Sequence, residues 1–178
     1  GVDAVKFQMR NNHLLFSKEK LSQPYNSSNS FGATYGEHRE ALELSVDEIR
    51  KLREHTFNAN MDFICTPFDE ASLKHLVEME VDAIKIASFD FGNFPFLMEV
   101  IETSKHFILS AGGSGYKLVD NFVSELIKLN ASFSLLHCVS EYPCPPEKVN
   151  LGRIKYLKEC YPQIQIGLSD HYSGILTG

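Results

Sequence analysis

Two lysines stand in the middle of apolar, strand-like runs. Lys6 lies in Ala-Val-Lys-Phe-Gln and Lys85 lies in Ala-Ile-Lys-Ile-Ala-Ser. Because the side chains of a strand alternate between its two faces, each lysine shares a face with small or polar neighbours and is backed by bulky apolar groups. An unpaired buried ammonium group is costly. Two of them directed into one interior therefore predict a bound anion, and a phosphorylated substrate is the natural candidate.

Further polar residues end other strand-like runs, and together with the lysines they form a list of candidate site residues: Gln8, Thr66, Ser88, Ser110, His137 and Ser169-Asp170-His171. Hydroxyls and lysines are good phosphate ligands, and a histidine can bind a metal or transfer a proton. Structural interpretations stay open as well. They are a strand end or turn for Thr66, helix caps for Ser88 and Ser110, a core position for His137 and a loop position for His171.

The elements that must position these residues alternate between strands and helices. Apolar, β-branched and aromatic runs predict strands at residues 4–8, 62–66, 83–88, 107–110, 132–138 and 164–168. A long polar loop is expected over residues 11–44. Ser45-Val-Asp-Glu48 is typical of a capping box, and Asp69 is a candidate cap for the next helix. An amphipathic helix is predicted by the spacing of Val119, Phe122, Val123, Leu126 and Ile127.

Strands that alternate with helices indicate parallel β/α units. Six units are too many for a simple open βαβ half and too few for a closed eight-stranded barrel. Polar residues recur at successive strand ends, which favours a (β/α)8 barrel that this chain covers incompletely. In that fold the carboxyl ends of the strands form the active site.

Composition limits the possible partners. The chain has 178 residues, 43% of them hydrophobic, which suits one globular domain with a real core. Its net charge of −6 argues against nucleic acid and anionic membrane as partners, so an anion site must be built locally. The four cysteines show no Cys-x-x-Cys pair, which is typical of a reducing cytoplasm, and the spacing of Cys138, Cys144 and His137 does not favour zinc. No stretch is long and apolar enough to predict a membrane span.

An ordered set of segments resembles the N-acetylneuraminate (sialic acid) synthase family. The segments are Gly1–Gln8, Thr34–Arg39 with Leu42–Ser45, Cys65–Asp69, Ile84–Ser88, Leu135–Cys138 with Tyr142-Pro143, and Gly167–His171. The resemblance implies a (β/α)8 TIM barrel, usually followed by a small antifreeze-like domain. On that basis residues 1–178 form a partial barrel domain of about strands two to seven. The first and last strands and any C-terminal domain are expected outside this chain.

The resemblance also implies an activity. The family condenses phosphoenolpyruvate with the open-chain aldehyde form of an N-acetylated amino sugar such as N-acetylmannosamine. The products are phosphate and a nine-carbon, sialic-acid-type 2-keto sugar acid for surface polysaccharides. The full-length protein is expected to be a cytoplasmic homodimer. The acceptor stays open among N-acetylmannosamine, its 6-phosphate, and legionaminate or pseudaminate precursors.

The matching positions imply individual roles. Those expected to hold the phosphate and carboxylate of phosphoenolpyruvate are Lys6, Thr66, Lys85, Ser88, Ser110 and Ser169. Those expected near the reacting carbons or the sugar are Gln8, Asp90, Ser140 and Tyr142, with a proton-handling or orienting role for Asp90. His171 would be one of two histidine ligands to a divalent metal, typically Mn2+, with Mg2+ or Co2+ as alternatives. His137 matches a family histidine near the substrate, and Tyr35, Glu37 and Arg39 match a loop that positions the sugar.

Departures from the family pattern keep other interpretations open. Asp90 replaces the usual glutamate, and Ser110-Ala-Gly-Gly-Ser114 replaces Ser-Thr-Gly-Met. The acidic residue of strand one and the second metal histidine are not in this chain, so we expect it to bind metal weakly and to have little activity by itself. The alternatives are a related phosphoenolpyruvate-dependent sugar-acid synthase, such as the 3-deoxy-octulosonate phosphate type, and a catalytically silent paralogue of the spore-coat polysaccharide type.

Overall fold

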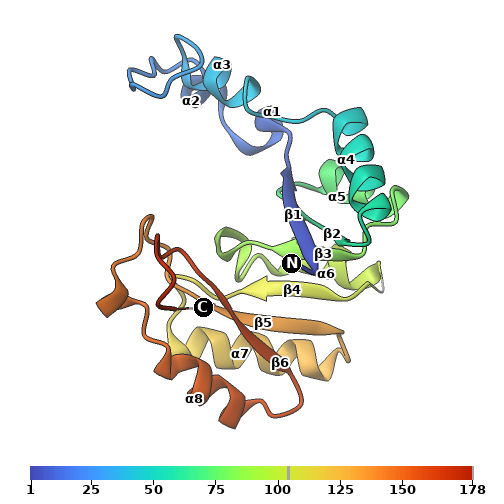
Figure 1. Cartoon of the computed structure of the whole chain (residues 1–178), viewed down its shortest axis with the longest axis vertical. Helices are drawn as coiled ribbons and strands as arrows, with labels where there is room; N and C mark the ends of the chain where they lie inside the picture. The colour runs from blue at the N-terminus through green and yellow to red at the C-terminus, as the bar shows by residue number, and fades with distance from the viewer. Residues whose placement is uncertain (104, 178) are drawn as a thin grey trace. The chain divides into compact units, whose positions relative to one another are not determined.

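The computed structural model describes residues 1–103 and 105–177, in which parallel strands alternate with helices along the chain (Figure 1). The chain divides into two compact units, unit 1 (Gly1–Asp82) and unit 2 (Ala83–Gly178). This alternation confirms the predicted α/β class. None of the helices in the described ranges combines the length and the apolar character needed to cross a membrane.

Unit 1 contains two parallel strands, β1 (Ala4–Met9) and β2 (Asp62–Pro67), which lie close to their predicted positions. The register places Lys6 opposite Ile64 and Gln8 opposite Thr66. Lys6 and Gln8 are exposed, whereas Phe7 is half-buried and stacks on Phe63 with 5.3 Å between ring centroids. The predicted alternation of faces along β1 is therefore confirmed.

The segment between β1 and β2 is more ordered than a polar loop. Besides the expected helix it contains three short helices, α1 (Asn12–Leu15), α2 (Lys18–Leu21) and α3 (Tyr35–Glu40). The prediction of one loop over residues 11–44 was wrong because each short helix has its own side-chain cap. The caps are Asn11, Ser17 and Thr34. Packing between aromatic rings also orders this segment, since the centroids of the His38 and Tyr25 rings lie 4.4 Å apart.

Two longer helices of unit 1 begin where the sequence predicts. Ser45 caps α4 (Val46–Asn58): its hydroxyl accepts from the Glu48 backbone N–H, and the Glu48 carboxylate accepts from the Ser45 N–H at 2.8 Å. Asp69 caps α5 (Glu70–Glu78) by accepting from the Ser72 N–H at 2.8 Å. Both caps satisfy backbone donors that the first turn of a helix leaves unpaired.

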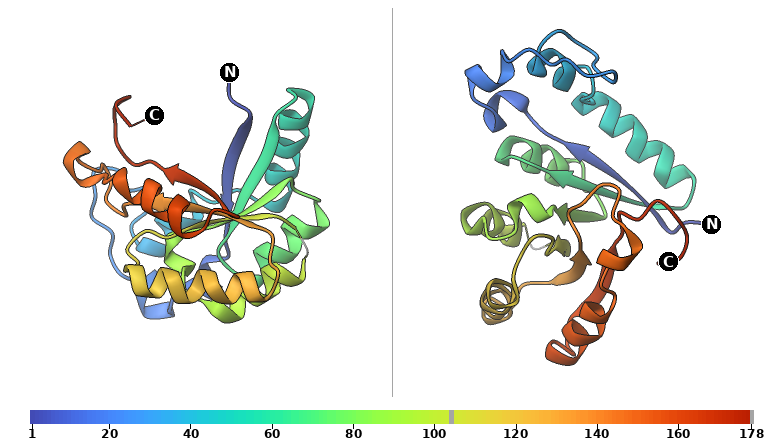
Figure 2. Two further views of the ribbon diagram at one scale, coloured as in Figure 1. Left: turned by 90° about the horizontal axis from the view of Figure 1, so that it is seen from below. Right: turned by 90° about the vertical axis from the view of Figure 1, so that its left-hand side faces the viewer.

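Unit 2 contains four parallel strands that pair in chain order: β3 (Ala83–Ile86), β4 (Phe107–Ser110), β5 (Phe133–Cys138) and β6 (Gln165–Ser169). The connections contain α6 (Phe94–Glu102), α7 (Tyr116–Lys128), α8 (Gly152–Cys160) and two 3-10 turns, η1 (Ser88–Asp90) and η2 (Pro146–Lys148). Helices α7 and α8 lie along one face of these strands (Figure 2). The strand predicted over 83–88 ends at Ile86 because η1 begins at Ser88.

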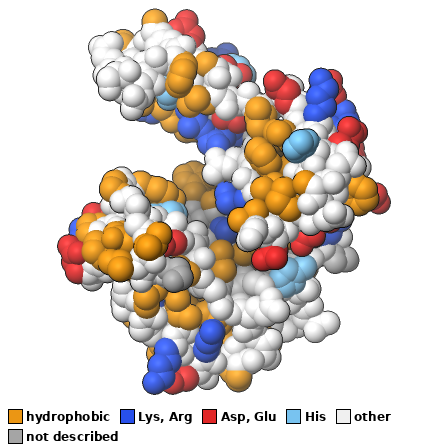
Figure 3. Space-filling model, in the orientation of Figure 1, with side chains coloured by type: hydrophobic (Ala, Val, Ile, Leu, Met, Phe, Trp, Pro, Cys, Tyr) orange, Lys and Arg blue, Asp and Glu red, His pale blue; other side chains and the backbone are white. Residues whose placement is uncertain are grey.

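Helix α7 confirms the predicted amphipathic helix with one exception. Val119, Phe122, Val123 and Leu126 are buried, whereas Ile127 is 39% exposed because it lies at the edge of the apolar stripe. Hydrophobic side chains also reach the surface of both units (Figure 3), and Leu118 of the same helix is 47% exposed. Helix α7 therefore carries leucines in two opposite environments.

Replacing Leu126 with alanine should lower the free energy of unfolding by about 2–5 kcal/mol, because the side chain is fully buried and its removal leaves a cavity. The Leu118→Ala variant is the matched control and should change the same free energy by less than about 0.5 kcal/mol. Urea unfolding of both variants measures the difference. Equal losses would contradict the assignment of the buried face of α7.

Candidate active site

A buried lysine and a serine meet at the end of two neighbouring strands of unit 2. Lys85 on β3 is 7% exposed, and its Nζ donates to the Ser110 Oγ at 2.5 Å and to the backbone oxygen of Ile86 at 2.9 Å. Ser110 is the last residue of β4 and is itself buried. These hydrogen bonds compensate part of the cost of removing the ammonium group from water. The predicted pairing of lysine and hydroxyl at the carboxyl ends of the strands is present here.

Two other chain segments approach Gly112, which lies in the loop that follows β4. The backbone N–H of Gly112 donates to the Ser88 Oγ at 2.9 Å. A Cβ atom added at Gly112 would lie 2.6 Å from the Ser88 Oγ and 2.9 Å from the Cys138 Sγ, and closer still to the Ser140 Oγ. Residue 112 therefore has no room for a side chain, and its backbone N–H is bonded to the Ser88 hydroxyl. The sequence pattern marks this loop only as a departure from the family pattern and does not single out Gly112.

The helix-cap interpretations of the two serines are not what the structure shows. Ala87 occupies the N-cap position of η1, and Gly115 occupies the N-cap position of α7. The Ser88 hydroxyl instead accepts from Gly112, and the Ser110 hydroxyl accepts from Lys85. Both hydroxyls are thus used in contacts between strand ends of unit 2.

His171 follows β6 and has a defined tautomer. Its Nδ1 lies 2.6 Å from the backbone oxygen of Val139, and because a carbonyl only accepts, Nδ1 carries the proton. The Nε2 lone pair is then the one available to a metal, which is the usual arrangement of a ligating histidine. The Tyr142 ring packs on the imidazole with 3.8 Å between centroids, and the Cys138 Sγ lies 3.9 Å from Nδ1. Ser169, which precedes this segment, ends β6 opposite Cys138.

The donor set around His171 fits one position of a metal site but does not complete it. No group of three or more His, Cys, Asp or Glu side chains that could hold a metal ion occurs in residues 1–103 and 105–177. The fixed tautomer leaves the Nε2 lone pair of His171 as a possible metal ligand, because neutral imidazole is a common ligand of metal ions.

Two other candidates of unit 2 are buried. His137 is 2% exposed and its Nε2 donates to the backbone oxygen of Val149 at 2.6 Å. Asp90 is 5% exposed, and its Oδ1 accepts from the Nδ2 of Asn93, the N-cap residue of α6, at 3.1 Å. Both side chains are therefore held by local hydrogen bonds, and their roles toward a substrate remain predictions.

The candidates of unit 1 lie on or beside β1. Thr66 is 2% exposed, whereas Lys6 and Gln8 are exposed. The prediction that both strand lysines are buried is correct for Lys85 and wrong for Lys6. The physical reason is that β1 has a hydrogen-bonded neighbour, β2, on one side only among the described strands. Burial raises the pKa of the Cys65 thiol to about 12, although the positive charge of Lys6 opposes this shift.

The loop residues that match the sugar-positioning segment already have structural partners. Glu37 completes the capping box of α3, and its carboxylate also accepts from the Ala33 N–H at 2.7 Å. Tyr35 packs edge-on against Phe16, and Arg39 lies 3.5 Å from Glu43. Contacts of Tyr35, Glu37 and Arg39 with a sugar therefore remain a prediction.

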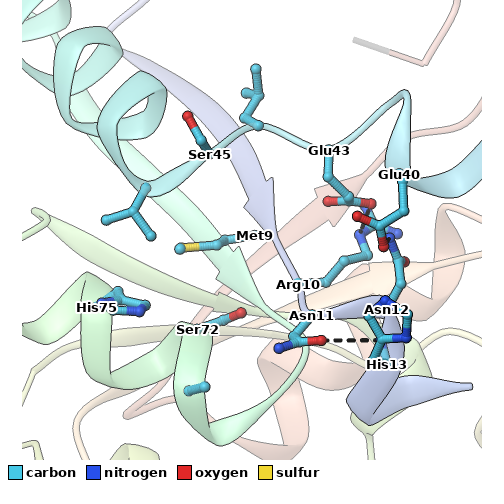
Figure 4. A pocket seen from close by; sticks show the side chains of 13 residues that line it. Met9, Arg10, Asn11, Asn12, His13, Glu40, Glu43, Ser45, Ser72 and His75 are labelled. Carbon is cyan, nitrogen blue, oxygen red and sulfur yellow. Dashed lines mark hydrogen bonds and ion pairs between the residues drawn. The ribbon is translucent and has the colours of Figure 1, made fainter.

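A cavity of about 430 Å³ lies in unit 1 (Figure 4). It is lined by Met9, Arg10, Asn11, Asn12, His13, Glu40, Glu43, Leu44, Ser45, Val46, Ala71, Ser72 and His75. None of the predicted site residues is among these. The polar part of its wall contains Arg10 and Glu43, which form an ion pair. No local sequence pattern predicts this pair, because the two residues lie on segments far apart in the sequence.

Replacing Gly112 with alanine should reduce stability, because the new methyl group collides with the Ser88, Ser140 and Cys138 side chains. We expect a loss of about 1–3 kcal/mol in the free energy of unfolding. Gly115→Ser is the matched control: a side chain there meets open space and can cap α7, so stability should be unchanged or higher. Urea unfolding of both variants measures the two effects, and a neutral Gly112→Ala would contradict the close packing at residue 112.

The four cysteines should differ in reactivity. Cys65, Cys138 and Cys144 are buried and Cys160 is exposed. At about pH 8.5, near the ordinary thiol pKa, iodoacetamide should alkylate Cys160 first, and Cys65 should stay unmodified until unfolding. Peptide mass spectrometry over time measures this order. Equal rates at Cys65 and Cys160 would show that burial does not suppress the Cys65 thiolate.

Comparison with known proteins gives matches along the chain. N-acetylneuraminate-9-phosphate synthase of Homo sapiens is 34% identical over 175 residues, which is 98% of this chain and 49% of that protein. N,N'-diacetyllegionaminic acid synthase of Campylobacter jejuni is 31% identical over 179 residues, which is 98% of this chain and 53% of that protein. The chain thus spans about half the length of these relatives.

A solved structure supports the same relationship. The N-acetylneuraminic acid (sialic acid) synthetase of Leptospira borgpetersenii in complex with citrate matches with a TM-score of 0.83 and 32% identity, over 98% of this chain and 56% of that chain. This likeness confirms the predicted fold class, a partial (β/α)8 barrel. The model of the NeuB family matches residues 1–178. Since the match covers the whole sequence, the chain belongs to the NeuB family.

Proposed function

We propose that the full-length protein containing this chain condenses phosphoenolpyruvate with an N-acetylated amino sugar, giving phosphate and a nine-carbon 2-keto sugar acid. The observation that carries the proposal is the buried Lys85 ammonium held against Ser110 in a NeuB-family chain. The Ser88 and Ser140 hydroxyls beside Gly112 support it, because hydroxyl groups are suitable phosphate ligands.

The reaction needs these residue types for charge stabilisation. The methylene carbon of phosphoenolpyruvate attacks the aldehyde carbon, and water adds to the carbon that bears the phosphate. That carbon then expels inorganic phosphate and becomes the ketone. Lys85 stabilises the negative charge on the departing phosphate and fixes its orientation. Asp90 is the proposed carboxylate for proton transfer or substrate orientation, and Lys6, Thr66 and Gln8 of unit 1 remain predicted substrate residues.

We further propose that His171 Nε2 is one ligand of a divalent metal, with Mn2+ as first choice and Mg2+ or Co2+ as alternatives. When bound, such an ion supplies Lewis-acid polarisation of the aldehyde oxygen. The chain itself contributes the orientation of the imidazole: the Val139 carbonyl fixes its tautomer, and the Tyr142 ring packs against it. Tyr142 is 76% exposed, so one side of this pair is accessible to a substrate.

Several sugars are candidates for the acceptor. The two relatives above are named for different products, N-acetylneuraminate 9-phosphate and N,N'-diacetyllegionaminic acid. Acceptors to test are therefore N-acetylmannosamine, its 6-phosphate and the diacetylated precursors of the second kind. A catalytically silent relative, by contrast, would release no phosphate with any of these sugars.

Phosphate release by the full-length protein, with Mn2+, phosphoenolpyruvate and each sugar, tests the proposal. Release should depend on one sugar, and Lys85→Ala or His171→Ala should lower kcat/KM by at least about 100-fold, since each removes transition-state charge stabilisation or a metal ligand. Lys155→Ala is the matched control, because its side chain is 84% exposed on α8. No release with any sugar, from folded protein loaded with metal, would leave the silent alternative.

A further inference from the structure

Arg10, one residue beyond β1, joins three segments of unit 1 through contacts with Gln8, Glu43 and Phe68. Arg10 and Glu43 are seen among the side chains that line the cavity (Figure 4). Its Nε lies 2.9 Å from the Glu43 Oε1, and its guanidinium carbon lies 4.6 Å from the centroid of the Phe68 ring. Its Nη2 donates to the Gln8 Oε1. The Arg10 side chain is 15% exposed. The planar guanidinium is thus held by a carboxylate at one edge, a ring on its face and an amide at another edge.

The contact with Gln8 settles which way its amide points. A guanidinium group has only donors, so the amide must present its oxygen to Arg10. The amide nitrogen of Gln8 is then directed away from Arg10 as a hydrogen-bond donor. Without Arg10, the terminal torsion of a glutamine has two nearly equivalent orientations, and the donor and acceptor would exchange freely.

Glu43 holds Arg10 in the position that this contact requires. Its carboxylate contacts both Arg10 and Arg39, and it belongs to the segment between α3 and α4. Burial raises the pKa of Glu43 and lowers the pKa of Arg10, while their mutual attraction opposes both shifts. Each charge therefore depends on the other, and the segment before α4 is fixed to the end of β1.

We infer that Arg10 is a positioning residue that presents the Gln8 side-chain nitrogen as a preformed donor to an oxygen of the substrate. The inference rests on the proposed function, in which Gln8 contacts phosphoenolpyruvate or the sugar. Ordering an exposed glutamine costs side-chain entropy. Arg10 meets that cost before the substrate binds, which lowers the free-energy cost of binding and of reaching the transition state.

A double-mutant cycle on kcat/KM in the full-length protein tests this inference. Arg10→Met keeps a long apolar stem over Phe68 and removes every donor, and it should lower kcat/KM by about 10-fold or more. In a Gln8→Ala background, the same change should cause less than about a 2-fold further loss, because Arg10 then has no amide to orient. Arg50→Met is the matched control, since Arg50 makes an exposed ion pair with Asp47 on α4 and should leave kcat/KM unchanged in both backgrounds.

The outcomes separate the inference from the proposed function. No phosphate release by the unmodified protein overturns the proposed function, whereas release with an unaffected Gln8→Ala variant removes the substrate contact on which the inference depends. Equal losses from Arg10→Met in both backgrounds would show that Arg10 is only structural, which also overturns the inference. If Arg10→Met does not fold, Arg10→Lys retains the charge opposite Glu43 without the planar fork, and the same cycle applies to it.

Discussion

The buried ammonium group of Lys85 is the constraint on which the candidate site depends. An isolated cation in this position would be strongly unfavourable, so the surrounding chain must supply acceptors, and the Ser110 hydroxyl and the Ile86 carbonyl do so. Ser110 can reach Lys85 only because β3 and β4 are parallel and end at the same edge. The hydrogen bond between Lys85 and Ser110 therefore depends on the strand order of unit 2.

A second constraint acts on the loop that follows β4, where residue 112 has no space for a side chain. Gly112 places a backbone N–H against Ser88 because no side chain separates the two segments. In unit 1 the corresponding fixation is electrostatic: Arg10 and Glu43 connect the end of β1 to the segment before α4. Polar side chains near strand ends are thus positioned in two ways. In unit 2 the Gly112 backbone packs closely against Ser88, and in unit 1 Arg10 forms an ion pair with Glu43.

Much of the fold could be predicted because its determinants are local. Apolar runs mark the strands, Ser45 and Asp69 mark helix starts, and a 3.6-residue period marks α7. Long-range determinants were missed. The Arg10 and Glu43 contact joins segments whose proximity no local pattern encodes, and the close packing at Gly112 involves Ser88 and Ser140. Lys6 was expected to be buried because its run is apolar, but burial depends on neighbouring strands.

In the proposed function, the Lys85 and Ser110 pair binds the phosphate of phosphoenolpyruvate. Calorimetric titration of the full-length protein with phosphoenolpyruvate, without a sugar, tests it most directly. Lys85→Met and Ser110→Ala should each weaken binding, the first by at least about 10-fold because a charged hydrogen bond is lost. Tight binding of phosphoenolpyruvate that neither substitution changes, in folded variants, would show that the Lys85 and Ser110 pair does not hold the phosphate.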